Sequence, residues 1–230
     1  LATLISFSNE IGNLCSSIGG IDALDVMNGV HLDKRFSPIL GNGERVKPGL
    51  VTYLEAGCGF GGSCFPKDVK ALISHGVNVG ESMDLLKSVI KINKYQPNQV
   101  MDRLRKHFPD FGNLKVAVLG LAFKPGTDDM RESPAIPIVE ELIAASAVVT
   151  AYDPVAQEEA STIFPEVGIT YCDSIENTVR GVDAVLLLTR WEEFKALPAI
   201  LKEQGASPLL VDGRRLLPRD CVDIYEGIGI

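Results

Sequence analysis

The sequence has few residues that could form metal sites or disulfide frameworks, and those it has are scattered. It contains five cysteines and three histidines, with no C-x-x-C pair and no group at metal-ligand spacing. The odd number of cysteines also argues against a closed disulfide framework. We therefore expect no bound metal and a reducing, cytoplasmic environment.

Long hydrophobic runs and basic clusters are also missing. No apolar run reaches the roughly 18 residues that a membrane-spanning helix needs. No run of lysine and arginine occurs, and the formal net charge is -8. We therefore expect no broad surface for nucleic acid or for an anionic membrane. The hydrophobic content of 46% is typical of a globular protein with a substantial core.

Up to about residue 108, apolar residues recur mostly at helical spacing. Helices are expected over 1–18, 21–30, 65–76, 82–96 and 98–107. Glycines at 19–20 and Gly76 are expected to end the first and third of these helices, and Ser82 to cap the fourth. Pro97 is expected to end or kink the fourth helix. The sequence also begins inside a helical pattern without a methionine, and we expect it to be a piece of a longer protein.

From Lys115 onward, short continuous apolar runs alternate with helical patterns. Strands are expected over 116–119, 148–152, 184–188 and 209–211, with outer strands over 169–171 and 222–225. Helices are expected near 134–146, 174–180 and 193–204. This alternation predicts βαβ units and a parallel sheet. The boundary between the two parts is expected near residues 109–113.

A glycine-rich segment, Ala56 to Asp68, carries the candidate nucleophile. It reads AGCGFGGSCFPKD, and its glycines allow unusual backbone angles and the close approach of a ligand. Because Pro66 suits the first turn of a helix, Cys64 is expected just before a helix N-terminus, where partial positive charge favours a thiolate. Asp68 is expected one turn further along on the same side. The alternative is that Cys64 is a small buried hydrophobic residue.

A second polar loop follows the first expected strand. The segment Gly120 to Ser133 is longer than a dinucleotide-binding turn and lacks the G-x-G-x-x-G pattern. In open α/β sheets, ligands bind beyond the carboxyl ends of the strands, which is the place that this loop occupies. Lys124 and Arg131 are suitable phosphate partners. The alternative for both is a solvated surface charge.

These segments resemble a known family. GFGGSCFPKD is similar to the catalytic-cysteine segment of the UDP-glucose/GDP-mannose dehydrogenase family, and LGLAFKPGTDDMRESP to its nucleotide-binding loop. VDGRR, at residues 211–215, resembles the family's later DGR segment. The resemblance covers nearly the whole sequence but only the later part of the family. We therefore expect that an N-terminal NAD-binding domain is absent and that this chain alone does not oxidise a nucleotide sugar.

The resemblance implies roles for individual residues. Cys64 would be the catalytic nucleophile, and Asp68 would handle protons and orient water. Residues that bind the substrate would be Arg35, Tyr53, Leu54, Glu55, Gly57, Gly61, Lys124 and Arg214. Residues near the NAD cofactor would be Phe65, Lys67 and Arg131. Between Arg35 and Tyr53, the sequence is longer than in common members of the family.

The resemblance also implies an architecture and an activity. An all-α central dimerisation domain over 1–108 would precede a Rossmann-like parallel α/β domain over 109–230 that binds a UDP-sugar. The implied activity is the NAD-dependent, two-step oxidation of UDP-glucose to UDP-glucuronate through a cysteine thiohemiacetal and thioester. It would occur in a homodimer in which Arg35 reaches the neighbouring active site. Two alternatives stay open: a GDP-mannose or UDP-N-acetylhexosamine 6-dehydrogenase, and a non-catalytic module for nucleotide-sugar binding and dimerisation.

Overall fold

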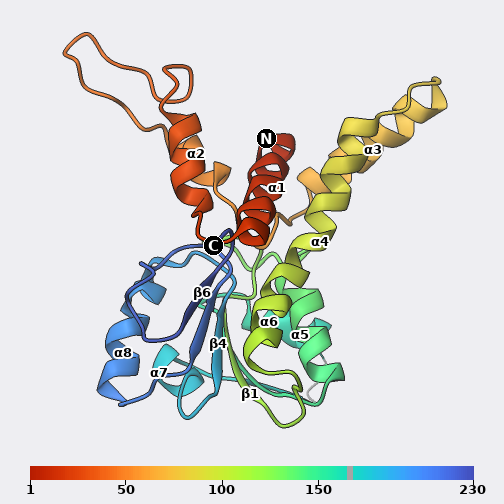
Figure 1. Cartoon of the computed structure of the whole chain (residues 1–230). Coiled ribbons are helices and arrows are strands. Elements are labelled where there is room, and N and C mark those ends of the chain that lie inside the picture. Colours follow the sequence, from red (N-terminus) through yellow and green to blue (C-terminus); the bar gives the residue numbers. More distant parts are fainter. Residues whose placement is uncertain (165–167) are drawn as a thin grey trace.

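The computed structural model describes residues 1–164 and 168–230 and places a helical part above a part built around a sheet (Figure 1). The helical part contains α1 (Ala2–Ile18), α2 (Ala23–His31), the 3₁₀ helix η1 (Gly49–Leu54) and α3 (Phe65–Asn78). Two arms project from it. One is the long loop that follows α2, and the other is formed by α3 and the start of α4 (Asp84–His107) (Figure 1).

Among the residues that the structure describes, the lower part contains six parallel strands in the order β3-β2-β1-β4-β5-β6. Their bounds are β1 (Lys115–Leu119), β2 (Val148–Tyr152), β3 (Ile169–Tyr171), β4 (Ala184–Leu187), β5 (Leu209–Asp212) and β6 (Tyr225–Gly227). The predicted parallel, Rossmann-like sheet is therefore confirmed, and the two strands expected at its outside are its edges. The last strand begins three residues later than the sequence pattern indicated.

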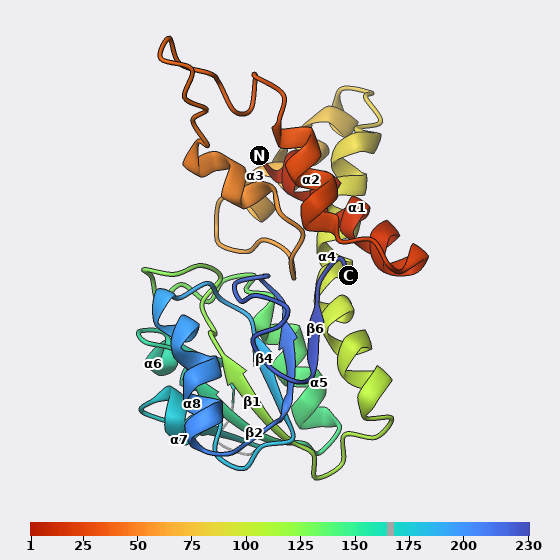
Figure 2. The same cartoon turned by 60° about the vertical axis from the view of Figure 1, so that its left-hand side comes forward.

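Helices cover both faces of this sheet, as Figure 2 shows. One face packs against α4, α5 (Ala135–Ala144) and α6 (Gln157–Ile163), and the other against α7 (Ile175–Thr178), η2 (Glu192–Ala196) and α8 (Leu197–Glu203). Strands buried on both faces are apolar at every position rather than alternating, which explains the continuous runs in the sequence. The short, polar α6 was not predicted. Among the described residues, no helix has the length and apolar character of a membrane span.

The long helix α4 corrects the prediction of two helices separated by Pro97. It is a single helix of 24 residues, and Pro97 lies buried inside it. Proline removes one backbone hydrogen bond and crowds the preceding turn. Tertiary contacts on both sides outweigh this cost: Gln96 bonds the glycine-rich loop, and Val100, Met101 and Leu104 are buried against the sheet.

Two predicted helix boundaries are also wrong. Ser82 does not cap α4, because its hydroxyl donates to the Asp84 carboxylate and Met83, with φ of 55°, is the residue before the helix. Gly76 does not end α3, which continues to Asn78. A Cβ atom at Gly76 would collide with the Met83 side chain, so the glycine allows close packing rather than termination.

A partly buried ion pair joins the helical part to the part built around the sheet. The Arg215 guanidinium donates to both carboxylate oxygens of Asp22 at 2.9 and 2.7 Å. Asp22 also caps α2 by accepting the Leu24 N–H. Burial alone would raise the pKa of Asp22, but the bonds from Arg215 and Leu24 outweigh it, so the pKa lies below its ordinary value. In the folded chain, Asp22 is therefore ionised at neutral pH and paired with Arg215.

Replacing Arg215 with methionine should destabilise the chain by about 3 kcal/mol at neutral pH, because it leaves a partly buried carboxylate unpaired. Since folding lowers the pKa of Asp22, its contribution is present above the unfolded value of about 3.9 and is lost as the pH falls through the folded value. The difference between wild type and R215M in urea unfolding should therefore shrink from pH 7 to pH 3. R180M, at an exposed site, is the matched control. An equal loss at both pH values would contradict the ion-pair account.

Candidate active site

A cavity of about 980 Å³ lies between the helical part and the carboxyl ends of the strands. Its lower wall consists of the loop after β1 together with Arg190 after β4 and Arg214 after β5. Its upper wall consists of residues of α1 and the glycine-rich loop before α3. The strand order reverses between β1 and β4, and ligands of open parallel sheets bind at this point.

The glycine-rich loop contacts the loop after β1 directly through backbone. The Gly62 N–H donates to the Arg131 carbonyl at 2.7 Å. A Cβ at Gly61 would collide with the carbonyl group of Glu132, and one at Gly62 would lie 2.7 Å from the Phe123 ring. Any larger side chain would push the two walls apart, which explains why glycine occupies these positions.

Cys64 lies at the N-terminus of α3 and on the wall of the cavity. The thiol is exposed, and the Ser63 hydroxyl lies 3.8 Å from its sulfur. The alternative, that Cys64 is a small buried hydrophobic residue, is therefore wrong, and the predicted position before a helix is confirmed. Asp68 donates its N–H to the Cys64 carbonyl at 2.8 Å. Its side chain is 69% exposed, lies 3.7 Å from Lys67 and is outside the cavity lining.

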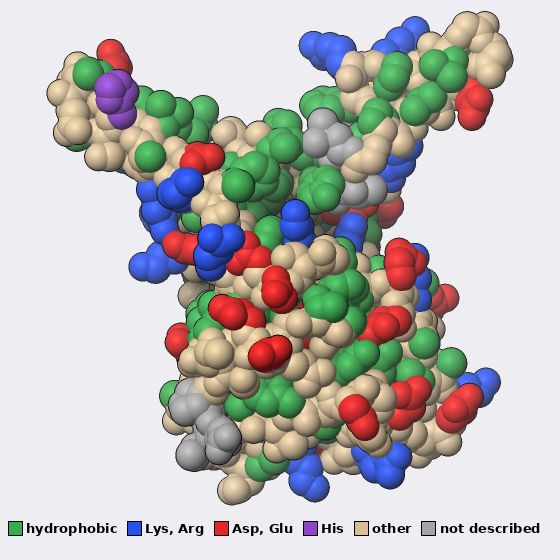
Figure 3. All heavy atoms as spheres, turned by 180° about the vertical axis from the view of Figure 1, so that it is seen from behind, with side chains coloured by type: hydrophobic (Ala, Val, Ile, Leu, Met, Phe, Trp, Pro, Cys, Tyr) green, Lys and Arg blue, Asp and Glu red, His purple; other side chains and the backbone are tan. Residues whose placement is uncertain are grey.

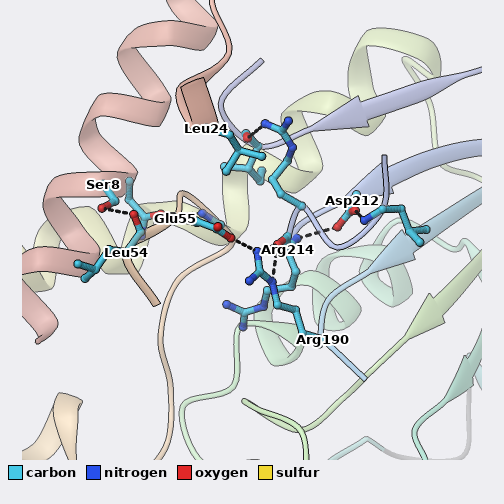
Figure 4. Close-up of polar contacts among 12 residues, drawn as sticks. Ser8, Leu24, Leu54, Glu55, Arg190, Asp212 and Arg214 are labelled. Carbon is cyan, nitrogen blue, oxygen red and sulfur yellow. Dashed lines mark hydrogen bonds and ion pairs between the residues drawn. The ribbon is translucent and has the colours of Figure 1, made fainter. Parts of the chain in front are cut away.

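Arg190 and Arg214 are held on the cavity wall by fixed acceptors (Figure 4). Arg214 donates to the carbonyls of Leu188 at 2.7 Å and Gly59 at 2.8 Å. Its buried Nη2 has no hydrogen-bond partner among the described residues. Arg190 donates to the Glu55 carboxylate at 2.5 Å and to the Arg214 carbonyl at 2.8 Å. A third cation, Lys124, lines the same cavity.

The cavity brings together most of the residues proposed from the sequence. Besides the residues named above, it is lined by Tyr53, Gly57, Gly61 and Phe65. Leu54 is instead buried behind the wall at 2% exposure, with its carbonyl accepting the Ser8 hydroxyl at 2.9 Å (Figure 4).

Lys67 and Arg131 lie on a second groove that shares Gly62 and Ser63 with the cavity. Lys70 adds a third positive charge to this groove. Arg131 pairs with Asp129 at 2.8 Å, and this pairing holds the pKa of Asp129 below its ordinary value. These three cations lie beside the N-terminus of α3, a position that favours an anionic group, and Lys70 pairs with Glu132 of the same groove at 2.8 Å. Within the described residues, no group of side chains could hold a metal ion.

Arg35 lies outside the cavity of its own chain. It is on the arm that follows α2 and is 87% exposed, with a salt bridge of 2.6 Å to Asp33. Hydrogen bonds from Arg35 lower the pKa of Asp33. The structure therefore leaves this arginine available to another molecule rather than to its own site.

Sequence reasoning missed four polar residues around the cavity: Arg190, Asn9, Asn93 and Gln96. Asn9 and Gln96 are completely buried, and each of the three amides bonds the backbone of the glycine-rich loop. The sequence contained a signal for the three amides, because they interrupt apolar stripes on helical segments and therefore indicate buried polar contacts. Arg190 carried no such signal, since an arginine after a strand is usually a surface charge.

Comparison with known proteins connects this geometry to one family. The model of the UDP-glucose/GDP-mannose dehydrogenase family, central domain, matches residues 1–95, and that of its UDP binding domain matches residues 117–219. The chain is 41% identical over 221 residues to the UDP-glucose 6-dehydrogenase YwqF of Bacillus subtilis, covering 96% of this chain and 47% of that protein.

Solved structures of nucleotide-sugar dehydrogenases have a similar fold. A UDP-glucose dehydrogenase from Pyrobaculum islandicum is 34% identical with a TM-score of 0.83, over 99% of this chain and 48% of that one. A UDP-D-ManNAc dehydrogenase from Pyrococcus horikoshii is 28% identical with a TM-score of 0.76, over 99% of this chain and 49% of that one. The chain thus spans about half the length of the relatives that it matches.

Proposed function

The chain belongs to the UDP-glucose/GDP-mannose dehydrogenase family, and on that basis we propose that it forms the substrate-binding and nucleophilic part of an NAD-dependent UDP-glucose 6-dehydrogenase. One observation carries the proposal: an exposed thiol at a helix N-terminus shares a cavity with Lys124, Arg190 and Arg214. A diphosphate next to the cations would place the attached sugar within the same cavity as Cys64.

The residues of the lower wall would bind the nucleotide. Lys124 and Arg214 are donors to the sugar and the diphosphate, since charge-assisted hydrogen bonds to phosphate are among the strongest polar contacts. The Nη2 of Arg214, which has no partner in the part of the chain that the structure describes, supplies one such donor. Tyr53, Glu55 and the backbone at Gly57 and Gly61 complete the wall around the sugar.

Cys64 would act on the carbon that is oxidised. When bound, NAD accepts a hydride from the C6 alcohol and later a second hydride, so that two cofactor molecules are reduced for each acid formed. Between these steps, the Cys64 sulfur adds to the C6 aldehyde and forms a thiohemiacetal, which the second oxidation converts to a thioester. Water then cleaves the thioester and releases the thiolate. A thiolate suits this sequence because it is both a good nucleophile and a good leaving group.

Asp68 and the basic groove would have supporting roles. Asp68 lies in the first turn of the Cys64 helix but outside the cavity lining, and it would exchange protons with solvent water that reaches the thioester. Phe65, Lys67 and Arg131 would contact NAD, whose remaining contacts would come from a further domain.

Two other substrates and one non-enzymatic role compete with this proposal. The similarity to a UDP-D-ManNAc dehydrogenase keeps a UDP-N-acetylhexosamine or GDP-mannose as the alternative sugar nucleotide. A module that only binds nucleotide sugars and dimerises is the alternative without chemistry. Measuring NADH formation by the complete enzyme with each nucleotide sugar separates all of these, because a binding module gives no turnover with any of them.

In the complete enzyme, Cys64→Ala should abolish acid formation and leave UDP-glucose affinity within about tenfold, or roughly 1.4 kcal/mol. The thiol bonds the reacting carbon, whereas the nucleotide is held by the cations of the other wall. The measurements are NADH formation and calorimetric titration. C172A, at a partly exposed cysteine outside the cavity, should retain activity. Normal turnover by C64A would rule out covalent catalysis.

Lys124→Ala and Arg214→Ala should each weaken the binding of UDP to this chain by roughly 1.5–3 kcal/mol, the value of hydrogen bonds that involve charged groups. Calorimetric titration with UDP measures the change, and an unfolding curve checks that Arg214→Ala, which also loses bonds to Gly59 and Leu188, stays folded. K202A on α8, exposed and outside the cavity lining, should bind like wild type. Unchanged affinity in both variants would contradict a role of these two residues in nucleotide binding.

The helical part is also proposed to form a homodimer. Exposed apolar side chains follow one another at helical spacing along the first helix: Leu1, Leu4, Phe7, Leu14 and Ile18 are 37–61% exposed. Figure 3 shows apolar side chains gathered between the two arms. Apolar surface of this extent is typical of a partner interface, and two-fold dimers are the commonest assembly. The projecting arm would then carry Arg35 to the substrate of the partner.

Mixing two inactive complete enzymes, Arg35→Ala and Cys64→Ala, should restore activity. If Arg35 acts across the interface, a mixed dimer has one site with an intact cysteine and an intact partner arginine. Light scattering should show a dimer at micromolar concentration, and subunit exchange is verified before the assay. If Arg35 serves its own chain, every site keeps a defect and the mixture stays inactive.

A further inference from the structure

Side-chain amides from two helices hold the loop that leads to Cys64. Asn93, on α4, bonds both backbone groups of Phe60: its Oδ1 accepts the Phe60 N–H and its Nδ2 donates to the Phe60 carbonyl, both at 2.8 Å. This pair of bonds resembles the pairing of two strands, with one side chain in place of a neighbouring backbone. It fixes the position and the orientation of the peptide at Phe60.

Gln96 and Asn9 hold the same loop three residues earlier. Gln96 donates to the Gly57 carbonyl at 2.8 Å, and Asn9, on α1, accepts the Gly57 N–H at 2.8 Å. Asn13 orients Gln96 by donating to its Oε1 at 2.8 Å. Both Gln96 and Asn9 are completely buried, where an unpaired amide or peptide group is costly. We call Asn9, Asn93 and Gln96 the amide clamp.

The loop needs such a clamp because its own sequence does not fix its conformation. Gly59 and Gly62 have φ values of 104° and 82°, and glycine reaches such angles at the cost of conformational freedom in the unclamped chain. The nearby ring of Phe60 packs edge-on against Phe65, 5.8 Å between centroids, in the first turn of the Cys64 helix. Through this ring contact, the position of Phe60 influences the position of α3, the helix that begins just after Cys64.

We propose that Asn93 and Gln96 are positioning residues for Cys64: by holding Gly57 and Phe60, they keep the thiol on the wall of the cavity that binds the nucleotide sugar. This inference rests on the proposed function for the identity of the ligand. Neither residue lines the cavity, so neither touches the ligand. Their effect acts through the loop.

The test measures how far UDP-glucose protects Cys64 from alkylation by iodoacetamide, with each cysteine followed by mass spectrometry. In the wild-type chain, saturating UDP-glucose should slow Cys64 alkylation at least tenfold. In Asn93→Leu and Gln96→Leu, protection should fall below threefold while the dissociation constant for UDP changes less than threefold. N98L, exposed on the same helix, should behave like wild type. Buried Cys15 should stay unreactive throughout, which excludes global unfolding as the cause.

Hydrogen exchange supplies a readout that needs no ligand. The backbone amides of residues 58–63 should exchange at least tenfold faster in Asn93→Leu than in wild type or N98L, with the amides of α1 and α4 unchanged. Unchanged exchange in the loop, or protection equal to that of wild type in both clamp variants, would overturn the proposal. If UDP-glucose fails to protect wild-type Cys64, the proposed function fails instead. In that case, the exchange rates of residues 58–63 alone test whether the amide clamp holds the loop.

Discussion

The geometry of the site depends on one close approach of backbone to backbone. The glycine-rich loop of the helical part meets the loop after β1 through the bond from Gly62 to the Arg131 carbonyl, and no Cβ fits at Gly61. This contact sets the separation of the cavity's two walls. The thiol comes from one wall and the cations from the other, and this contact sets their relation together with the bonds from the Cys58 N–H to the Gly213 carbonyl and from Arg214 to the Gly59 carbonyl. Glycine is required at this contact because any larger side chain would push the two walls apart.

Helix α4 makes this arrangement rigid. Its first half carries Asn93 and Gln96 to the glycine-rich loop, and its second half is buried against the sheet. Because one continuous helix belongs to both parts, the loop cannot shift relative to the strands without moving the helix. The Arg215–Asp22 pair ties the parts together at a second place. Attachments at separate places restrict rotation of one part against the other.

The parallel sheet explains why the cations meet. The loops after β1, β4 and β5 emerge at one edge because all three strands run in the same direction. Lys124, Arg190 and Arg214 therefore converge although up to 90 residues separate them in the sequence. Glu55 offsets part of this charge by pairing with Arg190, which also links the entry of the glycine-rich loop to the end of β4. The lower wall thus stays positive, because Glu55 pairs with Arg190 while Lys124 and Arg214 keep their charges.

The sequence by itself determined the local features: the alternation that makes a parallel sheet, the helical character of the first part, and the start of α3 after Cys64. These follow from periodicity, from glycine and from proline within a few residues, so no distant contact is needed to establish them. Tertiary structure decided the rest. It kept α4 continuous through Pro97, because contacts at Gln96 and along Val100 to Leu104 outweigh one lost hydrogen bond. It placed Asp68 outside the cavity and gave the buried amides Asn9, Asn93 and Gln96 a common target. These outcomes depend on which segments become neighbours in space, and side-chain spacing along one helix carries no information about the loop that packs against it.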